Sequence, residues 1–220
     1  MLFRSEPTNP NTLGEMIKVG RRGSLNGEIT IKGKQGHVAY PEKCKNPIDD
    51  LLKVCSSLNE KLDEGSKTFQ PSKLTITSID VGNKVTNLVP NSVKLRFNVR
   101  FNDNFKSGDI IKIINDRLKS SNCNYDLKTK VSGESFFNYS EKLTDSIVEA
   151  IKKVTKTEPE LSTSGGTSDA RFISKICPVI EFGIVGKTMH QINENISVTD
   201  IEKLSEIYFL FLKNIFKDKF

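Results

Sequence analysis

The sequence predicts an α/β protein in which a ferredoxin-like βαββαβ unit is inserted into a second α/β layer. Between residues 23 and 134, segments of alternating apolar residues and segments of helical spacing follow the order strand, helix, strand, strand, helix, strand. After Gly133 the pattern changes to a helix, a loop rich in Gly, Ser and Thr, a nearly continuous apolar run and a long final helix. That second pattern is typical of a covered α/β layer.

Each element of the inserted unit has its own signal. Alternation of apolar and polar residues predicts the strands, and Leu51, Leu58 and Leu62 lie among apolar residues at helical spacing after Pro47. Ser107 is expected to cap the second helix. The expected strands are 24–32, 73–81, 92–101 and 125–131, and the expected helices are 48–62 and 108–121.

The two ends of the chain are expected to form one unit, residues 1–22 with 135–220, around the insert at 23–134. Its predicted elements are a helix at 143–154, a short helix at 170–176, a buried strand at 178–184, and a final helix opened by a capping box of Thr199 and Glu202. These elements look like only part of a catalytic domain. We therefore expect exposed apolar surface around Ile180, Phe182 and residues 209–211.

Composition narrows the class of protein. A hydrophobic content of 36% with 27% charged residues predicts a soluble globular protein, and the start of the chain carries no secretory signal pattern. We therefore expect a cytoplasmic protein that binds neither membrane nor nucleic acid, since the net charge of +6 comes from dispersed lysines. The four cysteines, at positions 44, 55, 123 and 177, form no C-x-x-C pair and are expected to be reduced and mostly buried.

Three segments carry candidate chemistry. The only two histidines, His37 and His190, are both expected on loops, where a histidine is as often a solvated side chain as a functional one. The segment GGTSDARF at 165–172 has paired glycines, two hydroxyls and Arg171 at the expected start of a helix. Such a segment predicts either a carboxylate cradle or an ordinary helix cap. The pair Arg21-Arg22 is a second carboxylate anchor or a solvated charge pair.

Taken in order, the motifs SEPT, VGRRGS, GHVAYP, VTNLVP, FNVRF, SGESF, GGTSDARF and MHQINE resemble the succinyl-diaminopimelate desuccinylases. These belong to the larger family of di-zinc aminoacylases and carboxypeptidases, and the resemblance runs along essentially the whole chain. It implies a partial di-zinc aminopeptidase-like catalytic domain with an inserted dimerisation domain. The implied reaction is hydrolysis of N-succinyl-LL-2,6-diaminopimelate to succinate and LL-diaminopimelate in lysine and diaminopimelate biosynthesis.

The resemblance also implies roles for particular residues. Glu6 and His190 would each bind one zinc ion of a pair, with cobalt as an alternative metal. His37 would reach the active site of a partner subunit in a homodimer formed through residues 23–134 and stabilise the oxyanion there. The residues that would bind the dicarboxylate substrate are Arg21, Tyr40, Asn87, Arg100, Ser132, Gly166, Thr167 and Arg171.

The chain also departs from the family pattern. Thr86 stands where the family has a second Asn beside Asn87, and Gly186-Lys187 replaces a common polar pair. The N-terminal metal ligands and general-base glutamate of the family are not found, so this C-terminal portion is expected to be inactive alone. The alternatives are a related N-acyl amino-acid deacylase, such as acetylornithine deacetylase, and a non-catalytic dimerisation and substrate-binding module that works with a missing N-terminal catalytic segment.

Overall fold

The computed structural model describes residues 2–4 and 6–216. Its chain forms two compact units, one made of residues 1–21 and 136–220 and the other of residues 22–135.

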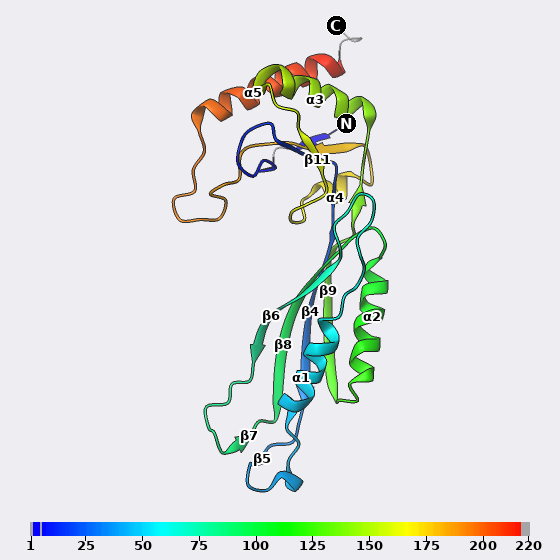
Figure 1. The fold of residues 1–220 in the computed structure, drawn as a ribbon, viewed down its shortest axis with the longest axis vertical. Helices are drawn as coiled ribbons and strands as arrows, with labels where there is room; N and C mark the ends of the chain where they lie inside the picture. The colour runs from blue at the N-terminus through cyan, green and yellow to red at the C-terminus, as the bar shows by residue number, and fades with distance from the viewer. Residues whose placement is uncertain (1, 5, 217–220) are drawn as a thin grey trace. The chain divides into compact units, whose positions relative to one another are not determined.

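The unit of residues 22–135 is a four-stranded antiparallel sheet with two helices, as predicted (Figure 1). Its strand order is β6-β8-β4-β9, so each strand–helix–strand segment skips over one strand of the sheet. This is the split βαβ arrangement of a ferredoxin-like fold. The elements are β4 (Gly23–Lys32), α1 (Pro47–Leu58), β6 (Lys73–Asp80), β8 (Ser92–Phe101), α2 (Ser107–Ser120) and β9 (Tyr125–Gly133).

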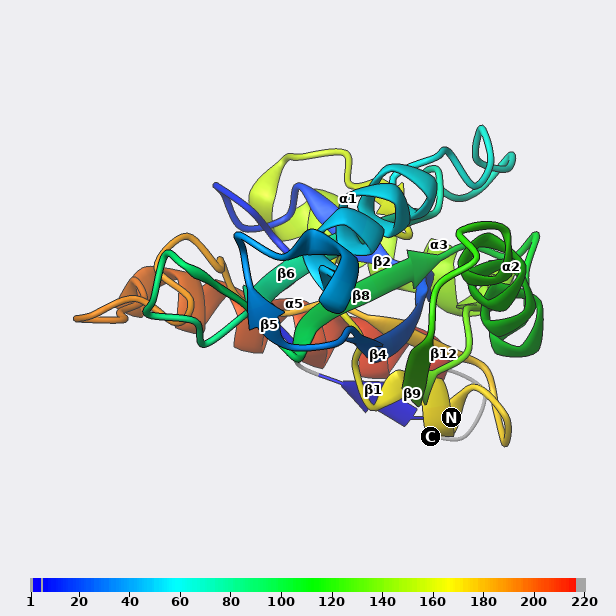
Figure 2. The same ribbon diagram turned by 90° about the horizontal axis from the view of Figure 1, so that it is seen from below.

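Both helices of this unit cover the same face of its sheet (Figure 2). Alternate residues of β4 and β8 point into that core, where Leu25 and Ile29 meet Leu95 and Phe97. Gly27 lies opposite Phe97, and a Cβ atom on Gly27 would lie only 2.0 Å from the Phe97 ring. The Phe97 ring therefore occupies the space that a larger residue at position 27 would need.

The end of α1 and the start of α2 differ from the predicted boundaries. Helix α1 ends at Leu58 rather than 62. Helix α2 begins at Ser107 itself, which is therefore not its cap, and Glu134 accepts a hydrogen bond from the backbone N–H of Ser107 at 3.0 Å. A carboxylate from the distant end of β9 thus satisfies one of the free donors at this helix start.

The second unit is a four-stranded mixed sheet in the order β1-β12-β2-β11, covered by two long helices. The first 22 residues supply two of its strands, which sequence patterns alone did not predict. Its elements are β1 (Leu2–Arg4), β2 (Met16–Lys18), β3 (Gly20–Arg21), β10 (Phe136–Phe137), α3 (Glu141–Thr155), β11 (Glu160–Ser162), α4 (Ala170–Ile173), β12 (Val179–Glu181) and α5 (Val198–Ile215).

Helices α3 and α5 pack against each other and against the sheet (Figure 1). Ile180 and Phe182 are buried beneath them, and Phe211 of α5 is also buried, so the expectation of exposed apolar surface there was wrong. Only Phe209 behaves as expected, with 67% of its side chain exposed. The capping box at Thr199 is also absent, because α5 begins at Val198 and its N-cap residue is Ser197.

Two further findings bear on the class of protein. Among the described residues, no helix is both long and apolar enough to cross a membrane. The four cysteines are free and half-buried, which is less burial than the sequence predicted.

Candidate functional site

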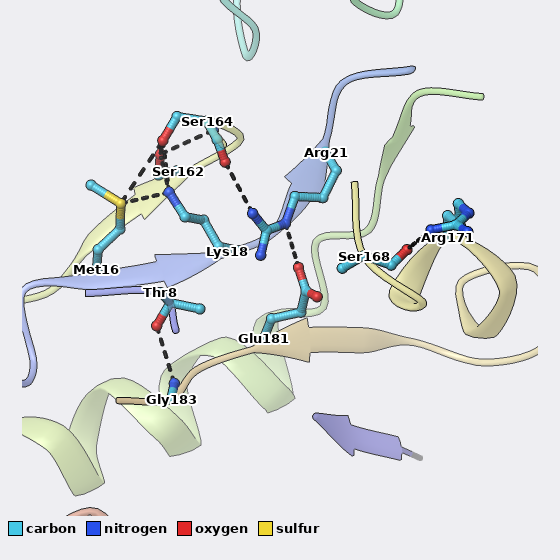
Figure 3. A network of polar contacts seen from close by, with 10 residues as sticks. All are labelled: Thr8, Met16, Lys18, Arg21, Ser162, Ser164, Ser168, Arg171, Glu181 and Gly183. Carbon is cyan, nitrogen blue, oxygen red and sulfur yellow. Dashed lines mark hydrogen bonds and ion pairs between the residues drawn. The ribbon is translucent and has the colours of Figure 1, made fainter. Parts of the chain in front are cut away.

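The loop between β11 and α4, residues 163–169, is fixed at its first turn by two cations from the neighbouring strands (Figure 3). Lys18 Nζ donates to Ser164 Oγ at 2.6 Å and to Ser162 Oγ at 3.3 Å. Arg21 donates from a terminal guanidinium nitrogen to the Ser164 carbonyl at 3.4 Å. The Ser164 N–H in turn donates to Ser162 Oγ at 3.2 Å. All three polar groups of Ser164 are therefore engaged.

Gly165 follows this anchored residue in a left-handed conformation, with φ of +97°. A Cβ atom there would lie 2.7 Å from the Arg21 guanidinium, so glycine is needed for both its backbone angle and its size. Gly166 is exposed and would meet nothing within 4 Å. The loop thus presents open backbone at Gly166, next to a position fixed by Arg21.

Arg21 is held by a buried carboxylate as well. Its Nε donates to Glu181 Oε2 at 2.6 Å, and the two side chains are 8% and 2% exposed. The other carboxylate oxygen of Glu181 is buried and has no hydrogen-bond partner among the described residues. Arg21 is buried and already paired with Glu181. Its guanidinium group is therefore not presented at the surface, where a substrate carboxylate would approach.

Arg171 closes the other end of the loop. It donates from one guanidinium nitrogen to the Ser168 carbonyl at 2.7 Å and stacks on Phe172, with 4.3 Å between the guanidinium carbon and the ring centroid. Its Nε and the Ser168 hydroxyl are buried without hydrogen-bond partners in the described part of the chain. Helix α4 is only four residues long, shorter than the helix predicted at 170–176, so its N-terminus contributes little positive potential to the loop.

Glu6 and His190, the predicted metal ligands, lie on two segments that are connected by hydrogen bonds of Asn9. Asn9 donates to the Gly183 carbonyl at 2.6 Å, and its own carbonyl accepts from the Gly186 N–H at 2.8 Å. The Glu6 backbone packs so closely on Gly183 that a Cβ atom there would lie 2.1 Å from the Glu6 carbonyl oxygen. His190 is exposed and has a left-handed backbone, with φ of 62°.

Within residues 2–4 and 6–216, no three side chains of His, Cys, Asp or Glu come together as a metal site. A catalytic zinc ion needs about three protein ligands. Glu6 and His190 are therefore at most part of a metal centre, and the donor set that these residues offer is incomplete for the family's metal pair.

In the other unit, three predicted residues are brought together at one small ribbon formed by β5 (Gly36–His37) and β7 (Leu88–Val89). The Val38 N–H donates to the Asn87 carbonyl at 3.1 Å, and the rings of His37 and Tyr40 lie edge to face with 6.0 Å between centroids. The Ala39 N–H donates to His37 Nδ1 at 3.1 Å. Since Nδ1 is the acceptor, Nε2 carries the proton of the neutral ring.

Arg100 and Ser132 lie on the four-stranded sheet of this unit, in β8 and β9, which are the two strands on either side of β4. Ser132 accepts a hydrogen bond from Asn26 at 3.1 Å. Arg100 lies near Arg22, and one guanidinium nitrogen of each is buried without a hydrogen-bond partner in the described chain. Burial lowers the pKa of Arg22, and the positive charge of Arg100 lowers it further. Burial also lowers the pKa of Arg100.

Sequence reasoning missed Lys18 and Glu181, the two buried charged residues of the loop network. Both are strand residues in runs of apolar sequence, MIKV and VIEF, where a charge is rare unless it is paired. That pattern was a usable signal. Burial lowers the pKa of Lys18 to about 8, with the nearby positive charge of Arg21 acting in the same direction and the carboxylates of Glu160 and Glu181 opposing it.

Comparison with known proteins shows which proteins the chain resembles. Residues 19–126 match the peptidase dimerisation domain. The chain is 50% identical over 216 residues to the succinyl-diaminopimelate desuccinylase of Pelagibacter ubique. This match covers 96% of this chain and 56% of that protein. It is 47% identical over 212 residues to the protein of the same name from Ehrlichia chaffeensis, with the same two coverages. The chain is therefore similar over nearly its whole length to succinyl-diaminopimelate desuccinylases. It spans about half the length of these relatives.

The chain shares its fold with two solved peptidases. An aminopeptidase PepT from Bacillus cereus superposes with a TM-score of 0.80 at 21% identity, over 97% of this chain and 56% of that one. An M20 family metallo-carboxypeptidase from Sulfolobus solfataricus gives a TM-score of 0.78 at 18% identity, over 96% and 62%. These likenesses concern the fold alone, and they confirm the predicted fold class.

Proposed function

We propose that this chain is the substrate-binding and dimerising part of a succinyl-diaminopimelate desuccinylase. The complete enzyme would hydrolyse N-succinyl-LL-2,6-diaminopimelate to succinate and LL-diaminopimelate. The observation that carries this proposal is 50% identity to a relative of that name along 96% of the chain. The loop that holds Gly166, Thr167 and Arg171 lies within that match.

In this proposal the loop at residues 163–169 receives a substrate carboxylate. The exposed backbone of Gly166 and the side chain of Thr167 offer donors, and Arg171 supplies a positive charge from the next turn. A carboxylate bound to an Arg and to backbone N–H groups forms short, charge-assisted hydrogen bonds. The resemblance also gives substrate-binding roles to four residues of the 22–135 unit, which are Arg100, Ser132, Tyr40 and Asn87.

Arg21 contributes to the cradle through the loop in this scheme. Its paired Nε leaves the terminal nitrogens to hold Ser164 and to fill the space beside Gly165. We therefore assign Arg21 to shaping the loop.

His37 would be the oxyanion donor. The hydrogen bond that Nδ1 accepts from the Ala39 N–H leaves the Nε2–H group as the donor of the neutral ring. A donor that is already oriented can stabilise the negative charge that develops on the amide oxygen in the transition state. As the family resemblance implies, this donor would serve the active site of a partner subunit in a homodimer formed through residues 23–134.

The metal pair of the proposed enzyme would activate water and polarise the amide carbonyl. Glu6 and His190 would each provide one ligand, and the remaining ligands and the general base would come from sequence outside this chain. Zinc is the metal that we propose, with cobalt as a substitute. We therefore expect no hydrolysis by this chain alone.

Substrate choice tests this function. The experiment uses a fusion of this chain with the part of the Pelagibacter ubique desuccinylase that it does not match. The fusion is assayed with zinc. We expect hydrolysis of N-succinyl-LL-diaminopimelate and little hydrolysis of N-acetylornithine. A preference for N-acetylornithine would instead assign the chain to the related N-acyl amino-acid deacylases. Tight dimers that bind succinate without any turnover in the fusion would favour a non-catalytic module.

A further inference from the structure

Lys18 is an unusual residue for its position. It lies in β2 between strands β11 and β12, opposite Ser162 on one side and Glu181 on the other, and its side chain is 5% exposed. A buried ammonium group is costly unless all its donors are used. Lys18 Nζ uses three acceptors, which are Ser164 Oγ, Ser162 Oγ and Met16 Sδ, the last at 2.7 Å (Figure 3).

These contacts converge on one residue of the loop. Ser164 is bound through its hydroxyl by Lys18, through its carbonyl by Arg21 and through its N–H by Ser162. Gly165 and Gly166 come next, and without side chains they have no means of their own to hold a position. The conformation of the exposed loop backbone therefore depends on where Ser164 is held.

We propose that Lys18 is a positioning residue, whose ammonium group fixes Ser164 and through it sets the carboxylate-binding conformation of residues 165–167. The ligand role of those residues rests on the proposed function, whereas the ordering of the loop by Lys18 stands on the contacts alone. Lys18 touches the loop and not the substrate.

The charges around Lys18 make the position sensitive to its protonation. Arg21 lies on β3, Glu160 on β11 and Glu181 on β12, and these are the charged groups that act on the ammonium. Above a pH of about 8 the group loses its proton and one of its three donors. The hold on Ser164 then weakens, whereas an arginine at position 18 would keep its charge throughout that range.

The first test measures amide hydrogen exchange, corrected for the intrinsic rate at each pH, in the full chain and in the variants Lys18→Met, Lys18→Arg and Ser164→Ala. We expect protection of the Ser164 amide, which donates to Ser162 Oγ, to fall roughly tenfold or more in Lys18→Met and in Ser164→Ala, because a hydrogen bond to a charged group is lost. Helix α3 should keep its protection, which shows that the fold is intact. Unchanged protection of the loop in both variants would overturn the proposal.

The second test follows the amide signals of Gly165 and Gly166 by NMR as succinate is added, between pH 7 and pH 9.5. For the natural chain we expect affinity to fall as pH passes about 8, while Lys18→Arg binds with an affinity that stays flat over this range. An equal fall in both proteins would overturn the role of Lys18. If succinate moves neither glycine at any pH, the carboxylate cradle is wrong, and the exchange measurement alone then decides whether Lys18 positions the loop.

Discussion

Arg21 and Glu181 form a buried ion pair that ties β3 to β12, with 2.6 Å between Arg21 Nε and Glu181 Oε2. Removing one partner of a buried pair leaves a charge without compensation, which costs about 3–5 kcal/mol. We expect Glu181→Leu to lower the free energy of unfolding by roughly that amount in urea titrations. The double variant Arg21→Met with Glu181→Leu should be less destabilised than either single variant. Additive losses would show that the pair is not coupled.

The contact between Gly27 and Phe97 gives a second prediction. A Cβ atom at position 27 would lie 2.0 Å from the Phe97 ring, so Gly27→Ala should lower the stability of the 22–135 unit by about 1–3 kcal/mol. Gly108 is the matched control, because it lies in α2 and its Cβ would meet nothing within 4 Å. Gly108→Ala should leave stability unchanged or raise it by up to about 1 kcal/mol. Equal effects of the two variants in thermal unfolding would contradict the packing described for β4 and β8.

Stability should depend on pH through Lys18. Its pKa is about 8 in the folded chain against an ordinary value of 10.5. Between these two values the unfolded chain binds more protons at this site than the folded chain does, so the free energy of unfolding rises with pH there. Urea midpoints measured from pH 7.5 to 10 should show this rise in the natural chain relative to Lys18→Met. Parallel curves for the two proteins would mean that burial does not lower the pKa of Lys18.

His37 should matter for the rate rather than for the fold. In an active fusion, His37→Ala should lower kcat by about 10²–10³-fold, the typical cost of removing one oxyanion donor. Glu42→Ala changes an exposed residue of the same segment and serves as a control that should retain most of the rate. The His37 variant should keep the melting temperature of its parent, since the side chain is exposed. A normal kcat in His37→Ala would remove the proposed donor role.

The dimerisation domain leads us to expect a homodimer of twice 24.7 kDa. Strands β6 and β9 are the two edges of the sheet in this unit, and a free edge can pair with a second copy. Multi-angle light scattering measures the mass directly. A monomer at all concentrations tested would mean that His37 cannot serve a partner's active site in this chain.

Sequence periodicity predicted the inserted unit well, because each strand buries one face and each helix buries one stripe. The bounds of β8 agree to the residue. The strand predicted at 178–184 contains β12, whereas β1, β2 and β11 were not predicted, since three residues are too few to show a period and their pairing joins distant segments. The loop network was missed for a related reason. Lys18 and Glu181 look like interruptions of apolar strands until their partners, Ser164 and Arg21, are brought beside them by the fold.

The site residues divide in the same way. Motif order identified the segments that carry His37, Asn87 and Arg171, yet only coordinates show that the Asn87 carbonyl accepts from Val38 and that Arg171 is turned toward Ser168. The helix predicted after the GGTSD loop is shorter than expected, since α4 has only four residues. The loop is fixed instead by two cations on neighbouring strands.

We propose that this chain supplies part of a desuccinylase active site and needs further metal ligands to act. The most direct test of this proposal is succinate release from N-succinyl-LL-diaminopimelate, measured with zinc or cobalt for the chain alone and for the fusion with the unmatched part of the Pelagibacter ubique relative. We predict no release by the chain alone and sustained turnover by the fusion, abolished by a chelator. Turnover by the chain alone, or none by a well-folded fusion, would contradict the claim.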